Sequence, residues 1–272
     1  MVPDNDKFSR RSFMTGLFGV VAGSSLLDYS EDGVQHNDIQ ITLFQTDKFL
    51  KENKEKRDDG QYSLKISKKY IEQELGKLSD ENSFTVNVSF AKSVIPRSEI
   101  YNDEKREMFE NWKSYFSNSV DAKDKSRDSN ILLSTTDGFP QTRGFGEYPN
   151  RSRRRSTVGI TFTASGLILS NEESINSQSG MGFSERSLIT VLHEIGHNLG
   201  FTHDMGYAWY DEEGDVIKTT PLLHNYYRSD DYKGKVNKFG QKIVHVDDVT
   251  TPVVKYMPQL NPKIKHKHVV YE

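Results

Sequence analysis

The chain has 272 residues, enough for one sizeable domain or two small ones, and it contains no cysteine. Disulfides and thiolate metal ligands are therefore excluded, so any metal must be held by imidazole or carboxylate groups. The formal net charge of −3 provides no overall basic field, and we expect no nucleic-acid partner.

The N-terminal segment has the pattern of an export signal. The pair Arg10-Arg11, followed by Phe13, resembles a twin-arginine signal, and residues 13–27 form a modestly apolar stretch rich in glycine and alanine. This stretch is shorter than the roughly 20 residues that span a bilayer, so we expect no membrane span beyond the signal. We expect a signal peptide over 1–27 and export through the twin-arginine pathway, to the exterior or the surface of a prokaryotic cell. An ordinary amphipathic N-terminal helix is the alternative.

Periodic apolar residues predict a series of strands and helices after a short polar linker at 28–37. Strands are predicted from alternation and β-branched residues at 38–44, 83–90, 130–135, 143–148 and 156–163. Helices are predicted from helical spacing at 63–78, from about Ser98 to Phe116, and at 185–200. The second helix carries an apolar stripe that we expect in the core, namely Met108, Phe109, Trp112, Tyr115 and Phe116. The mixed-charge run at 51–60 is expected to be a solvated loop.

The stretch HEIGHNLGFTHD, at the end of the third helix, concentrates residues that bind metal ions. His193 and His197 are four positions apart, so on a helix they lie on one face about 6 Å apart, and both ring nitrogens reach one zinc ion. Gly200 permits the left-handed conformation that ends a helix, after which the chain turns and His203 approaches the metal from the other side. Three such ligands leave one tetrahedral position open for water, which is the pattern of a catalytic zinc site.

Glu194 directly follows the first of these histidines and is placed to point toward the open position. We interpret it as the general base that takes the proton of the zinc-bound water as this water attacks a carbonyl group. The sequence therefore predicts a hydrolytic site with one catalytic zinc ion.

The pattern HExxHxxGxxH that begins at His193 resembles the metzincin clan of zinc endopeptidases. Asp204, the residue after the third histidine, is similar to the adamalysin (reprolysin) type, and the order of the preceding elements agrees with that type. The resemblance implies an α/β (α+β) fold in which a twisted five-stranded mixed sheet lies over an active-site helix, with a smaller irregular C-terminal subdomain. It places the catalytic domain at 28–272, with an upper subdomain at about 38–200 and a lower one at about 201–272.

The resemblance also implies a methionine turn beneath the metal. Met257 is the candidate, because Met205 is too close in sequence to His203 to loop under the site. The interval from His203 to Met257 is longer than is usual in the adamalysin type, and the cysteines common in that family are absent. A hydrophobic filler in a C-terminal turn is the alternative role for Met257.

A further implication of the resemblance is that a peptide substrate pairs with the edge strand next to the active-site helix. On this chain that strand contains Gly144, Phe145 and Gly146, and the two glycines permit close approach of a backbone. No residue stands out as a second oxyanion donor; the tyrosines that could serve are Tyr207, Tyr210 and Tyr256.

We thus expect an exported, monomeric zinc-dependent endopeptidase that acts on a protein or peptide. Two alternatives stay open: a catalytically inactive binding protein on the same fold, against which Glu194 argues, and a zinc hydrolase of a non-peptide acyl bond. The acidic run at 211–215 lacks the ligand periodicity of a calcium loop, so calcium binding has no support and a solvated turn is expected. The basic run at 151–155 is expected to be a solvated hairpin loop.

Overall fold

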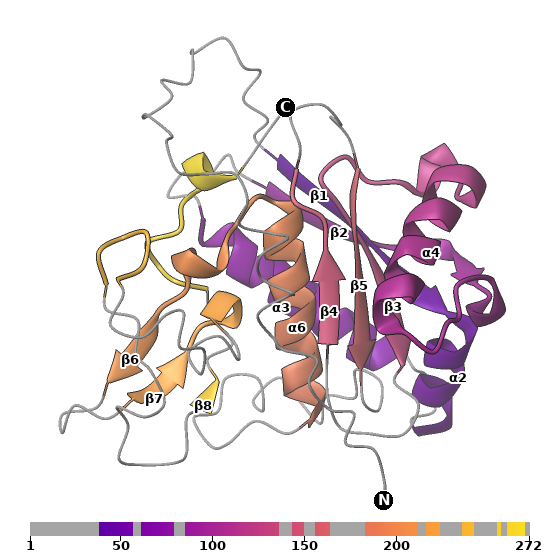
Figure 1. The fold of residues 1–272 in the computed structure, drawn as a ribbon, viewed down its shortest axis with the longest axis horizontal. Helices are drawn as coiled ribbons and strands as arrows, with labels where there is room; N and C mark the ends of the chain where they lie inside the picture. The colour runs from indigo at the N-terminus through magenta and orange to yellow at the C-terminus, as the bar shows by residue number, and fades with distance from the viewer. Residues whose placement is uncertain are drawn as a thin grey trace, which may run out of the picture. The chain divides into compact units, whose positions relative to one another are not determined.

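A five-stranded mixed sheet forms the centre of the protein, with strand order β2–β1–β3–β5–β4 (Figure 1). Four strands pair in parallel, namely β1 (Asp38–Thr46), β2 (Thr85–Ile95), β3 (Ser129–Thr135) and β5 (Thr157–Thr163). The fifth, β4 (Arg143–Gly146), runs antiparallel to β5 at one edge. The computed structural model describes residues 38–56, 61–78, 85–135, 143–149, 156–163, 183–210, 216–223, 236–241, 255–256 and 260–269. The expected signal peptide and linker lie outside these residues.

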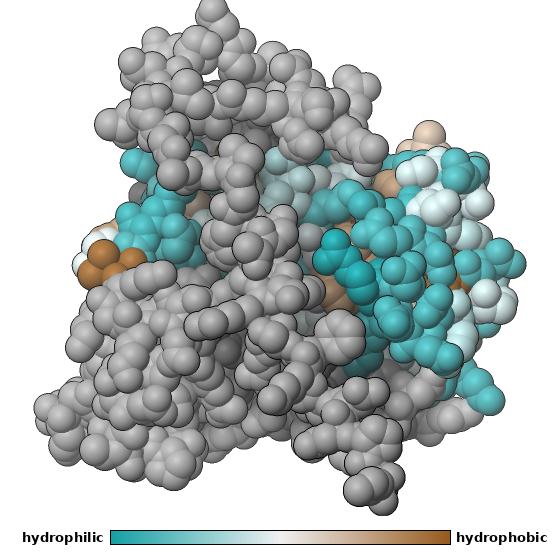
Figure 2. All heavy atoms as spheres, viewed as in Figure 1, coloured by the Kyte–Doolittle hydropathy of each residue, from teal (hydrophilic) through white to brown (hydrophobic). Residues whose placement is uncertain are grey.

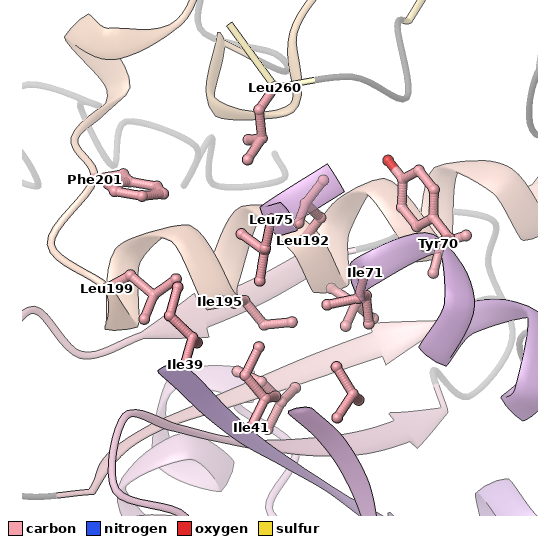
Figure 3. Close-up of a cluster of buried hydrophobic side chains, with 14 of the residues drawn as sticks. Ile39, Ile41, Tyr70, Ile71, Leu75, Leu192, Ile195, Leu199, Phe201 and Leu260 are labelled. Carbon is pink, nitrogen blue, oxygen red and sulfur yellow. The ribbon is translucent and has the colours of Figure 1, made fainter. Parts of the chain in front are cut away.

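Helices cover both faces of the sheet. Helices α3 (Gln61–Gly76) and α6 (Phe183–Asn198) contribute to one cluster of buried side chains, the α6 core, with members such as Ile41, Leu75 and Ile195 (Figure 3). Helix α4 (Lys105–Ser119) contributes to a second cluster, the α4 core, which contains Trp112 and Leu132. Because the middle of the sheet is buried on both sides, every residue of β3 is buried, and its sequence has no polar alternation.

The predicted fold class is confirmed by this arrangement. All five expected strands are present, and the helices predicted at 63–78 and 185–200 correspond to α3 and α6. The apolar residues at the C-terminal part of α6 and directly after it are almost fully buried: Leu188, Val191, Leu192, Ile195 and Leu199. The apolar stripe of α4 is also in the core, where Tyr115 is only partly buried.

The solvated loop predicted at 51–60 was wrong for residues 51–56, which belong to helix α2 (Asp47–Lys56). Thr46 caps this helix, since its hydroxyl accepts a hydrogen bond from the backbone N–H of Phe49 at 3.1 Å. Phe49 is fully buried in the α6 core and ties the helix to the sheet. Lysine and glutamate are good helix formers, so a mixed-charge run continues a helix that a cap has begun.

The start of the second predicted helix was also wrong. Ser98 lies in a short 3-10 turn, η1 (Arg97–Glu99), and α4 begins only at Lys105. Ile100, which follows the turn, is fully buried in the α4 core, and this anchors an irregular segment between β2 and the helix.

The C-terminal part of the described chain is built from short elements. A three-stranded sheet contains β6 (Ala208–Tyr210), β7 (Val216–Thr219) and β8 (Lys255–Tyr256) in the order β6–β7–β8. Single 3-10 turns are η3 (His203–Met205), η4 (Pro221–Leu223) and η8 (His266–His268). Leu260 and Ile264 lie in the α6 core, so this part shares a hydrophobic core with α3 and α6. The proposed boundary between subdomains near residue 200 stays a prediction.

Figure 2 shows a mostly hydrophilic face over helix α4, with few apolar atoms. Across the described ranges, no helix combines the length and the apolar character that are needed to cross a membrane.

Replacing Trp112 tests the α4 core. Trp112 is fully buried, packs against Phe44 and Phe116, and donates its indole N–H to the carbonyl of Gly159 at 3.0 Å. We expect Trp112→Ala to lower the free energy of unfolding by about 3–5 kcal/mol, because it leaves a cavity and an unsatisfied carbonyl. Urea denaturation measures this loss, with Tyr115→Ala on the same helix as the control. An equal loss in the two variants would contradict the packing described here.

Candidate metal centre

Helix α6 presents two histidines from its last two turns. His193 and His197 are four positions apart and are 7% and 5% exposed. They share the helix with residues of the α6 core, of which Leu192 and Ile195 appear in Figure 3. The packing of the apolar side therefore sets the direction in which the two imidazoles point.

The helix ends in a glycine turn that brings the chain back toward the two histidines. Gly200 has a φ of 89°, the left-handed conformation that was expected from the sequence. Its N–H donates to the carbonyl of His197 at 2.9 Å, and the N–H of Phe201 donates to the carbonyl of Gly196 at 2.8 Å. These two bonds form a Schellman motif, and the fully buried Phe201 fixes the exit of the chain. His203 then begins the turn η3.

The three predicted ligands come together. The Nε2 atom of His197 lies 2.9 Å from Nε2 of His193 and 2.9 Å from Nε2 of His203, and the remaining pair is 3.3 Å apart. Three imidazole nitrogens bound to one tetrahedral zinc ion lie about 3.4 Å from each other. The three distances agree with that spacing to within about half an ångström.

Hydrogen bonds at Nδ1 of His193 and His197 show which ring nitrogen carries the proton and which has a free lone pair. Nδ1 of His193 lies 2.8 Å from the carbonyl oxygen of Pro221, and Nδ1 of His197 lies 2.8 Å from that of Phe201. A carbonyl only accepts, so each Nδ1 carries the proton and each Nε2 keeps its lone pair. Lone pairs 2.9 Å apart repel each other unless a cation lies between them. The donor set therefore fits a zinc ion.

Burial keeps the imidazoles neutral. It lowers the pKa of His193 to about 4 and, together with repulsion from His193, the pKa of His197 to about 3. The pKa of His203 is also lowered, first by burial and then by its two neighbours. Neutral imidazole is the form that binds metal ions, so all three rings are ready to bind at neutral pH.

Glu194 is buried between helix α6 and the edge strand β4. Burial raises the pKa of its carboxyl group well above the ordinary value, and the residue is 3% exposed. A Cβ atom at Gly144 would lie 2.7 Å from Cδ of Glu194, and one at Gly146 would lie 3.0 Å from its Oε2. The carboxylate thus occupies the space that these two glycines leave open. The two glycines were predicted to permit close approach of a substrate backbone, whereas in the structure they make room for the side chain of Glu194. Pairing of a substrate with this strand stays a prediction.

The other residue of the predicted substrate strand points into the α4 core. Phe145 stacks on Phe109 at 5.8 Å between ring centroids and meets Phe162 edge-on. This orientation follows from strand alternation, because its two glycine neighbours face α6.

Tyr148 is a site residue that sequence reasoning did not identify. It follows the end of β4, is 40% exposed, and its ring centroid lies 4.8 Å from that of His197. Its place at the end of an edge strand was visible in the sequence, but the contact with His197 depends on how β4 packs against α6.

Several predicted residues are not part of this cluster or lie outside the described residues. Asp204 is exposed and accepts a hydrogen bond from the hydroxyl of Thr202. Met205 is buried in the α6 core. The candidate for the methionine turn, Met257, lies outside the described residues, as do the runs 151–155 and 211–215. Tyr207 was one of the tyrosines considered as oxyanion donors. Its backbone N–H donates to the hydroxyl of Thr220, which does not test that role of its side chain.

A match to one protein family agrees with the motif. Residues 98–204 match the family described as Metallo-peptidase family M12B Reprolysin-like, and this range includes α4, α6 and all three histidines. Among solved structures, metalloproteinase-II from Bacteroides fragilis is similar at 18% identity, over 61% of this chain and 43% of that chain, with a TM-score of 0.41. This chain therefore covers less than half the length of that protein. Among the curated proteins, no sequence matches this chain. The recognition of a reprolysin-like metallopeptidase segment is confirmed by the family match.

Gly144→Ala tests the packing of β4 against Glu194. The added methyl group displaces the carboxylate, and we expect the free energy of unfolding to fall by about 1–3 kcal/mol. In a Glu194→Ala background the same change meets no carboxylate, so its cost should nearly vanish. Gly76→Ala is the control, because a Cβ atom there meets nothing within 4 Å. Equal costs of Gly144→Ala with and without Glu194 would contradict this contact.

Proposed function

We propose that this protein, whose residues 98–204 match the reprolysin-like family of metallopeptidases, is a zinc-dependent endopeptidase. The observation that carries the proposal is the convergence of the Nε2 atoms of three neutral histidines, the buried His193 and His197 and the partly buried His203. The family match supports a metallopeptidase at the level of the family. The cleavage of internal peptide bonds and the roles of single residues are our inference.

The histidines would hold one zinc ion through Nε2. When bound there, zinc supplies a Lewis acid that polarises the carbonyl group of the substrate and makes a water molecule more acidic. The carbonyl oxygens of Pro221 and Phe201 hold the rings of His193 and His197 in the orientation that this binding needs.

Glu194 is the proposed general base. Its carboxylate takes the proton of the attacking water and later gives it to the departing amine. Burial raises the pKa of this carboxyl group, which makes it a stronger proton acceptor than an exposed carboxylate, while a nearby divalent cation favours its ionised form. Both effects act on the same group, and together they favour a base that is ionised and still reactive near neutral pH.

The edge strand β4 is the proposed site of the substrate backbone. It pairs with β5 on one side, and among the described strands it has no neighbour on the other. An extended peptide that adds to such an edge gains backbone hydrogen bonds, and it would lie next to α6. Tyr148, at the end of β4 and next to His197, would contact a substrate bound there.

Replacing Glu194 with Gln tests the catalytic proposal. We expect hydrolysis of casein or of a fluorogenic peptide to fall about 100-fold to 10,000-fold, because the base is lost, while zinc content stays at one ion per chain. Glu110→Gln, an exposed change on α4, serves as the control and should retain full activity.

The outcomes separate the possible functions. A zinc-loaded, folded wild type that cleaves no peptide would contradict the endopeptidase. Cleavage of an ester or another acyl substrate instead would identify a non-peptide hydrolase, and no cleavage of either would identify a binding protein.

We expect His203→Ala to lower zinc content sharply, and an unchanged zinc content would remove His203 from the site.

Export through the twin-arginine pathway is also part of the proposal. It rests on Arg10 and Arg11, followed by the apolar stretch at 13–27. In a bacterial host that has this pathway, we expect replacement of both arginines with lysine to leave the protein inside the cell. Cell fractionation followed by immunoblotting measures this, and export of the double-lysine variant at the wild-type level would exclude the twin-arginine signal.

A further inference from the structure

The backbone that follows His203 is held by two segments from near the C-terminal end of the chain. Three consecutive carbonyl groups accept hydrogen bonds from these segments. The carbonyl of Asp204 accepts from the N–H of Lys238 at 2.7 Å. The carbonyl of Met205 accepts from Nδ2 of Asn261 at 2.9 Å, and that of Gly206 accepts from Nδ2 of Asn237 at 2.7 Å.

Asn237 and Asn261 belong to one buried network. They are 4% and 1% exposed, and both donate to Oε1 of Gln241, at 2.8 and 2.9 Å. Oδ1 of Asn237 accepts from the N–H groups of Phe239 and Gln241, and Oδ1 of Asn261 accepts from that of Lys263. The amide oxygens and nitrogens of Asn237 and Asn261 are thus all bonded. A buried polar network that is fully satisfied is rigid, because moving any member leaves another one unpaired.

His203 needs such support more than the other two histidines do. Helix α6 sets the spacing of His193 and His197, whereas His203 lies in η3, a turn of three residues. The bonds within this turn, from Met205 to Thr202 and from Gly206 to His203, close a single short loop. A 3-10 turn of this length has little stability of its own, so partners from outside must hold it in place.

We propose that Asn237 and Asn261 are positioning residues for His203. By holding the carbonyls of Met205 and Gly206, they keep Nε2 of His203 within 2.9 Å of Nε2 of His197 and so set the affinity for zinc. The inference rests on the proposed role of His203 as a zinc ligand. It adds that this ligand is controlled by residues far along the chain, since Asn237 lies 31 positions after Gly206 and Asn261 lies 56 positions after Met205.

Zinc affinity, measured by competition with a chelating indicator, tests this inference. We expect Asn261→Ala and Asn237→Ala each to weaken zinc binding roughly tenfold, the low end of the effect of losing a direct hydrogen-bond partner of a metal ligand, because these residues bond to the backbone after His203 and not to its ring. Gln241→Ala removes the acceptor that Asn237 and Asn261 share but keeps both asparagines. We expect it to disturb the fold less and to cause a smaller loss of zinc affinity.

Asn130→Ala is the matched control. Asn130 is also fully buried, donates from Nδ2 to the carbonyl of Ser126 at 2.9 Å, and accepts at Oδ1 from the N–H of the same residue. It lies on β3, outside the network that holds η3. We expect it to destabilise the protein, as judged by urea denaturation, without changing the affinity for zinc.

A double-variant cycle shows whether the effect passes through His203. In a His203→Ala background, Asn261→Ala should cause no further loss of zinc affinity. The same tenfold loss in that background, or the same loss in Asn130→Ala, would overturn the inference, and so would unchanged affinity in both Asn237→Ala and Asn261→Ala. A wild type that binds no zinc would instead contradict the proposed function, so the two failures are distinguishable.

Discussion

The mutual approach of three imidazole Nε2 atoms is the constraint on which the rest of the site depends. Nε2 atoms 2.9 Å apart repel each other, and they are held there by bonds on the opposite side of the rings. The carbonyls of Pro221 and Phe201 act on the two helical histidines, so the helix, the turn after Gly200 and the turn η4 all contribute to one arrangement. Without a cation this arrangement is unfavourable, and the fold therefore maintains a site that favours metal binding.

A second constraint comes from the edge of the sheet. The carboxylate of Glu194 needs space on the side of α6 that faces β4, and Gly144 and Gly146 provide it. Between them, Phe145 points to the other face and joins the aromatic rings of the α4 core. Strand alternation therefore serves both sides of the sheet: one side accommodates the proposed base, and the other fixes the strand against α4.

The features that the sequence predicted well depend on neighbours in the chain. The helical spacing of His193 and His197 and the left-handed conformation of Gly200 are local, and the structure contains both. The contacts of Tyr148 and Pro221 with the histidines are not local, because they depend on how separate elements pack. Helix α2 was missed for a different reason: a mixed-charge run is compatible with both a helix and a loop, and the cap at Thr46 together with the burial of Phe49 favours the helix.

The three proposed ligands thus differ in what positions them. Two belong to a helix whose geometry is set within a few residues, whereas His203 lies in a turn whose carbonyls bond to residues far along the chain. In a chain in which only the region up to η3 has folded, His193 and His197 would share one face of α6, His193 would lack the carbonyl of Pro221, and the turn that carries His203 would lack its partners. Zinc binds three fixed imidazoles more tightly than two, so on the proposed ligand set tight binding would require that the C-terminal segments have docked. By linkage, zinc bound to these ligands would stabilise the docked state over the undocked one, and metal loading would be coupled to completion of the fold.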